Sequence, residues 1–208
     1  MIRNIVGRTA LQDPDHLTLD QLLVEIRACA NCAAVLPLGP RPVVQAGIGA
    51  RLLIIGQAPS SRVHETGTPW DDASGERLRD WIGIDRRTFY DPARIALMPM
   101  GFCYPGRAAS GGDAQPRREC APLWHGRLLG CLGGLRLTLL VGHYAQKAYL
   151  APSGASMTET VRAFRAHLPR KLPLPHPSWR STGWMRRNPW FTEEVLPAVR
   201  EQVQAALD

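Results

Sequence analysis

Residues 51–60 read RLLIIGQAPS, an apolar run that leads directly into a turn containing Gly56 and Pro59. A short run of consecutive apolar residues that ends at a glycine is typical of a parallel strand buried on both faces. The sequence predicts three further strands, at 95–98, 135–141 and 172–174. Because the last run contains Pro173, and proline interrupts strand pairing, we expect it to lie at an edge of the sheet.

Amphipathic segments around these strands predict helices. They lie at 19–29, 75–82, 119–132, 145–150 and 193–207. Asp15 or Thr18 is placed to cap the first helix, since both residue types favour helix N-termini. Strands that alternate with helices predict an α/β fold with three layers, α/β/α, around a mostly parallel four-stranded sheet. The length of 208 residues suits a single domain over residues 1–208.

The composition is that of a globular protein with a basic surface. Hydrophobic residues make up 45% of the chain, charged residues 21%, and the formal net charge is +7. No apolar run approaches the roughly 20 residues of a membrane helix, and residues 1–10 lack the apolar core of a signal peptide. We therefore expect a cytoplasmic protein with no membrane association. The positive charge favours a polyanionic partner such as DNA.

The segments that follow the predicted strands carry the candidate functional residues. Carboxyl ends of parallel strands meet at one edge of a sheet, where α/β proteins bind ligands. This places Gly56, Cys103, Gly142 and His176 along that edge. His176 stands between two prolines, which preset its backbone, so its ring is suited to hydrogen-bond a developing negative charge. The other five histidines, His143 among them, are expected to have structural roles.

A second group of candidates lies in residues 66–75, which read TGTPWDDASG. It sets the flat indole of Trp70 beside the carboxylates of Asp71 and Asp72. An aromatic plane can stack on a nucleobase, and an ionised carboxylate can assist the breaking of a glycosidic bond. Asp72 or Ser74 could instead cap the following helix. Both interpretations hold together if Ser74 caps the helix while Asp72 faces a pocket.

The segment after His176 combines aromatic residues with arginines. Residues 179–191 read WRSTGWMRRNPWF and are expected to form a loop. Apolar side chains on such a loop can fill the gap left in a base stack, and arginines can hold phosphates. The candidates for DNA contact are Arg180, Trp184, Met185, Arg186 and Arg187, together with Ser60 and Arg62 after the first strand. Trp184 and Met185 are expected to be hard to bury beside the arginines, whereas Trp190 and Phe191 are expected to anchor the last helix.

Five cysteines are present, and two of them form a C-x2-C pair, Cys29 and Cys32. In a chain without an export signal such a pair indicates a metal or redox site before a disulfide framework. Reduced, buried cysteines are the alternative. Cys131 lies in a predicted helix and is expected to belong to the core.

Taken in this order, the motifs resemble those of the uracil-DNA glycosylase superfamily, most closely its iron–sulfur branches, families four and five. The resemblance covers residues 29–191. The turn at 56–60 is similar to the first motif of the superfamily, Trp70 falls where an aromatic residue stacks on uracil, and 176–178 matches the second motif, whose histidine stabilises uracil O2. The base-binding residues that the resemblance implies are Gly56, Gln57, Ala58, Pro59, Trp70 and Ser178.

The resemblance extends to the cysteines. Cys29, Cys32, Cys103 and Cys120 fall where these families bind a [4Fe-4S] cluster, a C-x2-C pair before the first strand and a C-x16-C pair after the second. Four thiolates suit such a closed site, with zinc as the alternative metal. The cluster is expected to be structural and to hold the segment 103–120 against DNA.

The sequence departs from the family pattern where a catalytic acid would lie. Gln57 and Ala58 stand where families four and one have a glutamate and an aspartate, and neither can be a general base. The water-activating aspartate of family five precedes a Ser-Gly pair, which matches Asp72; Asp71 could substitute because this loop is one residue shorter. The asparagine that reads uracil would fall near Pro99 and is missing. Uracil would then be read by backbone groups and Gln57, which leaves room for xanthine or hypoxanthine.

The resemblance therefore implies a monomeric, monofunctional glycosylase of base-excision repair that removes uracil from DNA. Its catalytic residues would be Asp72 and His176, with Asp71 as the substitute. Arg180 stands where the family has its apolar wedge, so the intercalating residue stays open. No lysine falls in the motifs, which argues against lyase chemistry. The alternatives are a non-catalytic or covalently trapping damaged-DNA-binding protein of the same fold, and a hydrolase of free nucleotides.

Overall fold

The computed structural model describes residues 17–109, 111–150 and 154–208. At its centre is a four-stranded sheet in the order β2-β1-β3-β4, with every neighbouring pair parallel. The strands are β1 (Leu52–Ile55), β2 (Ile95–Leu97), β3 (Leu137–Val141) and β4 (Lys171–Leu174). All four coincide with predicted strands. The strand that contains Pro173, β4, is an edge strand as expected.

The α-helices are α1 (Leu19–Arg27), α2 (Ser61–Thr66), α3 (Ala73–Ile82), α4 (Arg86–Phe89), α5 (Cys120–Gly130), α6 (His143–Tyr149), α7 (Met157–Arg162), α8 (Ser181–Arg187) and α9 (Leu196–Leu207). Two 3₁₀ turns, η1 (Ala33–Val35) and η2 (Phe164–His167), and a π-helical turn, η3 (Phe191–Val195), complete the elements of the described residues. The predicted helices correspond to α1, α3, α5, α6 and α9. The prediction missed α2, α4, α7 and α8, because helices of 4 to 7 residues are too short to show a clear apolar periodicity.

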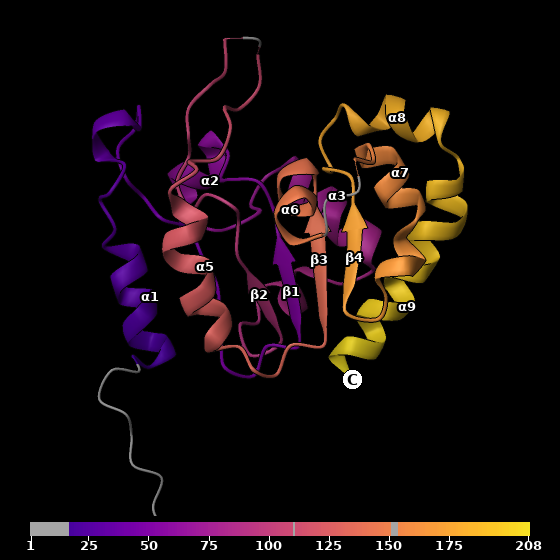
Figure 1. Cartoon of the computed structure of the whole chain (residues 1–208), viewed down its shortest axis with the longest axis horizontal. Helices are drawn as coiled ribbons and strands as arrows, with labels where there is room; N and C mark the ends of the chain where they lie inside the picture. The colour runs from indigo at the N-terminus through magenta and orange to yellow at the C-terminus, as the bar shows by residue number, and fades with distance from the viewer. Residues whose placement is uncertain (1–16, 110, 151–153) are drawn as a thin grey trace, which may run out of the picture.

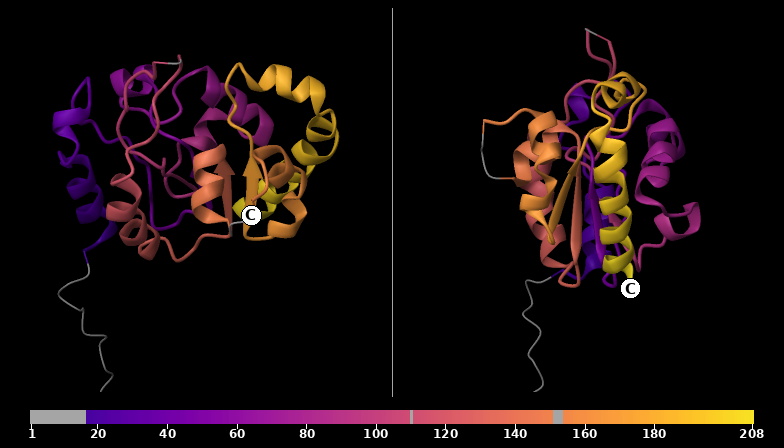
Figure 2. Two further views of the ribbon diagram at one scale, coloured as in Figure 1. Left: turned by 45° about the horizontal axis from the view of Figure 1, so that its top comes forward. Right: turned by 90° about the vertical axis from the view of Figure 1, so that its right-hand side faces the viewer.

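Alternate residues of the central strands face opposite layers of helices. Leu52 and Ile54 of β1 belong to a core that is packed with α3, α7 and α9. Leu53 and Ile55 belong to a second core, packed with α1, α5 and α6. Helices accordingly cover both faces of the sheet (Figure 2). This is the predicted three-layer α/β/α architecture, and burial on both faces explains why β1 is continuously apolar.

The first described helix begins at a capping box. The side chain of Thr18 accepts a hydrogen bond from the N–H of Gln21 at 3.3 Å, and the side chain of Gln21 accepts one from the N–H of Thr18 at 2.9 Å. The other candidate cap, Asp15, and the segment 1–10 lie outside the described residues. Within the described part of the chain, no helix has both the length and the apolar character needed to cross a membrane.

Two segments rise beyond the carboxyl ends of the strands (Figure 1). One connects β2 with α5 and is called here the β2–α5 segment; its described residues are 98–109 and 111–119. The other is the loop after β4 together with α8. These segments frame the edge of the sheet at which the sequence places its candidate residues.

Candidate active site

A cavity of ≈ 580 Å³ opens at the carboxyl ends of the strands, within the size range of small-molecule sites. Its walls come from the turn after β1, the loop before α3, the β2–α5 segment and the loop after β4. The predicted site residues that line it are Gly56, Gln57, Ala58, Pro59, Ser60, Trp70, Asp72, His176, Ser178 and Arg180. The fold thus brings the three sequence motifs into one crevice.

The indole of Trp70 is an ordered part of the cavity wall. It stacks on the imidazole of His176, with ring centroids 5.9 Å apart and planes inclined by 29°. Trp70 has a φ of +58°, a left-handed conformation that costs a non-glycine residue on the order of 1–3 kcal/mol. A Cβ on Gly56 would lie 2.6 Å from Cζ2 of Trp70. Glycine at position 56 therefore allows the indole to lie against the turn after β1.

The carboxylate of Asp72 is fixed from two sides. Its Oδ1 accepts a hydrogen bond from the N–H of Gly75 at 2.9 Å and so caps α3. Its Oδ2 accepts a hydrogen bond from Oγ of Ser60 at 2.7 Å. The expectation that Ser74 caps this helix is wrong, because Asp72 is the cap and lines the cavity at the same time. Its position is set before any ligand binds.

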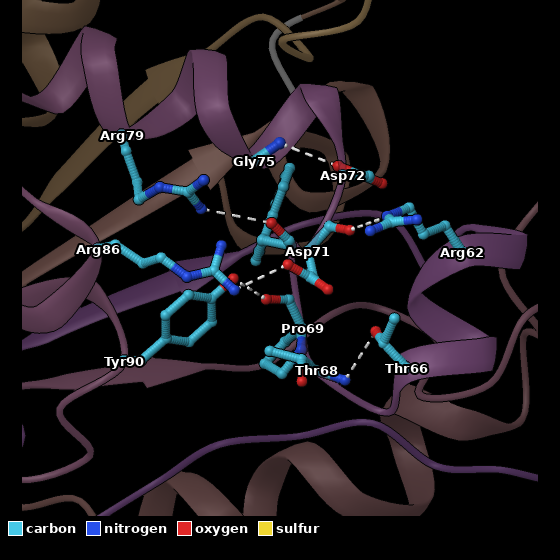
Figure 3. A network of polar contacts seen from close by, with 11 residues as sticks. Arg62, Thr66, Thr68, Pro69, Asp71, Asp72, Gly75, Arg79, Arg86 and Tyr90 are labelled. Carbon is cyan, nitrogen blue, oxygen red and sulfur yellow. Dashed lines mark hydrogen bonds and ion pairs between the residues drawn. The ribbon is translucent and has the colours of Figure 1, made fainter.

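Asp71 faces a different set of partners from its neighbour (Figure 3). Its carboxylate forms an ion pair with Arg86 at 2.9 Å, and this hydrogen bond lowers the pKa of the carboxyl. Its carbonyl oxygen accepts a hydrogen bond from Nε of Arg62 at 3.0 Å. Neither Asp71 nor Arg62 lines the cavity. The structure thus separates the two adjacent aspartates, with Asp72 alone at the cavity.

His176 is partly buried at the end of β4. Burial lowers the pKa of its imidazole, while the carboxylate of Asp72 opposes part of this effect. The neutral form, which has one donor and one acceptor nitrogen, is thereby favoured. The loop is held from α3 by Arg77, whose guanidinium donates to the carbonyl of Ser178 at 2.6 Å and to Oγ of Ser181 at 3.3 Å.

Gln57 joins two walls of the cavity. Its Nε2 donates to the carbonyl of Ala114 at 3.4 Å, which ties the turn after β1 to the β2–α5 segment. Pro99, at the position of the missing asparagine, also lines the cavity. The carbonyl of Pro99 accepts a hydrogen bond from Nε2 of His125 at 3.1 Å, and Nδ1 of that histidine lies 2.6 Å from the hydroxyl of Tyr149. His125 is therefore a satisfied structural histidine, as expected.

The prediction of a continuous loop over 179–191 is wrong, because this segment contains α8. The helix turns Trp184 and Met185 toward the core formed with α7 and α9, and both are partly buried there. The indole Nε1 of Trp184 also donates to Oγ1 of Thr158 at 2.8 Å. The expectation that these two residues are hard to bury is therefore also wrong. Phe191 is fully buried, which confirms its anchoring role.

Cationic groups lie around the cavity and on α8. Arg180 lines the cavity, and its guanidinium carbon lies 5.5 Å from the ring centroid of Trp179. Trp179 is 76% exposed, so it is the aromatic side chain of this segment that is open to a partner. Arg186 and Arg187 are exposed at the end of α8. Arg180 can therefore contact a phosphate at the cavity, while Arg186 and Arg187 add positive charge at the C-terminal end of α8.

The four cysteines of the predicted cluster, Cys29, Cys32, Cys103 and Cys120, line one small cavity between the end of α1, the β2–α5 segment and the start of α5. Burial raises the pKa of the Cys103 thiol to about 11 and that of the Cys120 thiol to about 12, and the neighbouring cysteines add to both shifts. The N–H of Phe102 donates to Sγ of Cys120 at 3.3 Å. Cys131 packs against the second core, as expected.

No group of three or more histidine, cysteine or acidic side chains in the described residues is arranged to hold a single metal ion. The four cysteines nonetheless line one cavity, and four thiolates are a donor set that suits either a [4Fe-4S] cluster or a zinc ion.

Sequence reasoning missed several residues of the cavity wall. Arg107 and Asp113 come from the β2–α5 segment, where they form an isolated antiparallel bridge. Trp179 lines the cavity from the loop after β4. Arg107 and Asp113 belong to no motif, and Trp179 begins the aromatic segment 179–191 but was not among its candidates for DNA contact. Only the length of the irregular segment after a strand end indicated that it contributes to the site.

Comparison with known proteins identifies the family. The family model described as "Uracil DNA glycosylase superfamily" matches residues 44–200, which include Gly56, Trp70 and His176. The solution NMR structure of a "putative Uracil DNA glycosylase" from Methanosarcina acetivorans has a TM-score of 0.41 and 18% identity, over 77% of this chain and 98% of that chain. A likeness of that strength establishes neither activity nor substrate. The family match spans most of the sequence, and this chain belongs to the uracil DNA glycosylase superfamily.

Proposed function

We propose that this protein is a monofunctional DNA glycosylase that hydrolyses the N-glycosidic bond between uracil and deoxyribose in DNA. Membership of the superfamily supports a DNA glycosylase role. The observation that carries the proposal is the convergence of Trp70, Asp72 and His176 on one cavity at the carboxyl edge of the sheet. These residues combine a stacking plane, an anchored carboxylate and a histidine whose neutral form is favoured.

Binding begins with contacts between arginine side chains and the DNA backbone. Arg180, Arg186 and Arg187 hold backbone phosphates, and the uracil nucleotide rotates out of the helix at a cost of a few kcal/mol. Trp70 then stacks on the extruded base. Because its indole is already held against Gly56 and His176, little ordering of this side chain accompanies binding.

Bond breaking separates charge along the glycosidic bond. The C1′–N1 bond lengthens and its electron pair moves to uracil, which leaves cationic character on the sugar. A neutral His176 donates a hydrogen bond to the uracil oxygen that gains negative charge; one such donor is typically worth about 10²–10³ in rate. Asp72, fixed by Ser60 and Gly75, places its negative charge where the sugar becomes cationic.

The asparagine that reads uracil in related families is missing, and its absence affects which bases the site accepts. Pro99 stands at that position and Gln57 lies on the cavity wall with its amide directed to Ala114. Uracil is then read by backbone groups and by Gln57, and this loose recognition admits xanthine or hypoxanthine. Release rates measured with oligonucleotides that contain each base define the preference.

The proposal includes a [4Fe-4S] cluster held by Cys29, Cys32, Cys103 and Cys120, which line one cavity. Cys29 and Cys32 would hold the cluster from the segment after α1, and Cys103 and Cys120 would hold it from the β2–α5 segment and the start of α5, so that the bound cluster would link these segments. The N–H of Phe102, which donates to Sγ of Cys120, would support the bound thiolate. A visible absorption spectrum of the purified protein tests this assignment, since an iron–sulfur protein is brown and a zinc protein is colourless.

The test of activity uses a labelled oligonucleotide that contains one deoxyuridine. Incubation with the protein followed by alkali should cleave the strand at the uracil position, and Asp72→Asn and His176→Ala should slow the cleavage by about 10²-fold or more. Tight binding of the same oligonucleotide without any abasic product would support a damage-binding protein instead. That alternative is favoured by Gln57 and Ala58, which replace the carboxylates of the first motif.

A further inference from the structure

Two carboxylates line the cavity in the described residues, those of Asp72 and Asp113, and their surroundings differ. Both oxygens of Asp72 accept hydrogen bonds, from Gly75 and from Ser60. Asp113 lies on the β2–α5 segment, and no hydrogen bond within the described chain engages its carboxyl group. The carboxylate of Asp72 is therefore fixed by hydrogen bonds on both oxygens, whereas that of Asp113 is available to exchange a proton with a ligand.

We propose that Asp113 is the general base that activates the attacking water, while Asp72 remains an electrostatic stabiliser of the sugar cation. This inference rests on the proposed function and adds a second catalytic residue to it. A dissociative hydrolysis needs both roles, because the cationic sugar requires a fixed negative charge and the water must lose a proton. The cavity supplies one carboxylate for each.

The electrostatics of the cavity agree with this division. Burial raises the pKa of Asp113, and the negative charge of Asp72 raises it further, while Arg107 opposes the shift. A carboxylate with a raised pKa is a stronger base, nearer to the pH at which the enzyme works. Arg180 lines the same cavity, and its guanidinium lies near Gly112, the residue before Asp113.

Two other titratable groups belong to these surroundings. His176 lines the same cavity. Burial raises the pKa of Tyr104, and the nearby charge of Asp113 adds to this shift. Neither side chain replaces Asp113 in the proposed step, because His176 serves the leaving base and the hydroxyl of Tyr104 stays protonated near neutral pH.

The proposed step balances as follows. The C1′–N1 bond breaks and its electron pair leaves with uracil as an anion. The oxygen of one water molecule forms a bond to C1′, and a proton of that water passes to the carboxylate of Asp113. Asp113 later releases this proton to solvent, and the uracil anion takes up a proton from solvent. The products are neutral uracil and an abasic site.

The experiment measures single-turnover release of uracil from a deoxyuridine oligonucleotide as a function of pH. In the wild type the rate should rise with pH through the pKa of Asp113, because only the ionised carboxylate accepts a proton. Asp113→Asn should lower the rate about 10²-fold or more and remove this acidic limb. Its affinity for the oligonucleotide should stay unchanged. Asp80→Asn, an exposed aspartate on α3, is the control and should behave as wild type.

A wild-type rate in Asp113→Asn, with the acidic limb intact, would overturn the inference and leave the proposed function standing. Absence of uracil release from the wild type itself would instead refute the proposed function. Asp113→Ala, checked for an unchanged melting temperature, guards against a folding defect. A loss of rate in both folded variants supports the inference.

Discussion

The burial that favours the neutral imidazole of His176 also makes the free energy of unfolding depend on pH. The pKa of the folded-state imidazole is lowered from its ordinary value of 6.5. Below that value the unfolded chain binds a proton that the folded chain takes up less readily, so this histidine makes the protein less stable as the pH falls. Above it both states are neutral, and the effect is absent.

His176→Gln should therefore lose less stability than the wild type between about pH 7.5 and about pH 5. Urea unfolding at both pH values measures the difference. His143→Gln, which removes an exposed histidine, is the control. An equal loss in His176→Gln and the wild type would contradict the lowered pKa.

The carboxylate of Asp72 has two roles, since it caps α3 and also lines the cavity. Asparagine is as good an N-cap as aspartate, whereas alanine is a poor one. Asp72→Asn should keep the free energy of unfolding within about 0.5 kcal/mol of the wild type, and Asp72→Ala should lose about 1 kcal/mol. Both should lose at least about 10²-fold in uracil release. Activity that tracks stability across the two variants would argue that Asp72 is only a cap.

Two tryptophans of the segment 179–191 have different surroundings in the structure because of helix α8. Trp184 packs against the core and bonds to Thr158, whereas Trp179 is exposed at the cavity. Trp184→Ala should lower the free energy of unfolding by roughly 2–4 kcal/mol. Trp179→Ala should leave stability unchanged and weaken oligonucleotide binding by about 1–3 kcal/mol. Thermal melts and fluorescence-anisotropy titrations distinguish these outcomes, and the reverse pattern would contradict the placement of α8.

The α/β architecture of the protein could be predicted from the sequence, because burial and strand pairing restrict which residues a strand can contain. The continuous apolar run of β1 predicted a strand buried on both faces, and the proline of β4 predicted an edge strand, because burial and ladder pairing act on those residues directly. Short α8 was missed, since its seven residues are helical mainly through tertiary packing of Trp184 and Met185.

Some residues of the candidate site could likewise be predicted from the sequence, and others could not. Residues in compact motifs after strands, such as Gly56 and His176, were found because their strand ends meet at one edge. The choice between Asp71 and Asp72 needed the ion pair with Arg86, which no local pattern reveals. Asp113 reaches the cavity from an irregular segment, where side-chain direction depends on the path of the loop.

The central claim is that three separate segments act on one extruded uracil, and a double-variant cycle tests it most directly. Single-turnover uracil release is measured for the wild type, Asp72→Asn, His176→Ala and the double variant. When two groups act as one unit, the rate losses caused by substituting each of them are not additive. The double variant should therefore be no more than about tenfold slower than the slower single variant. Single variants that release uracil at the wild-type rate, or a wild type that releases none, would contradict the claim.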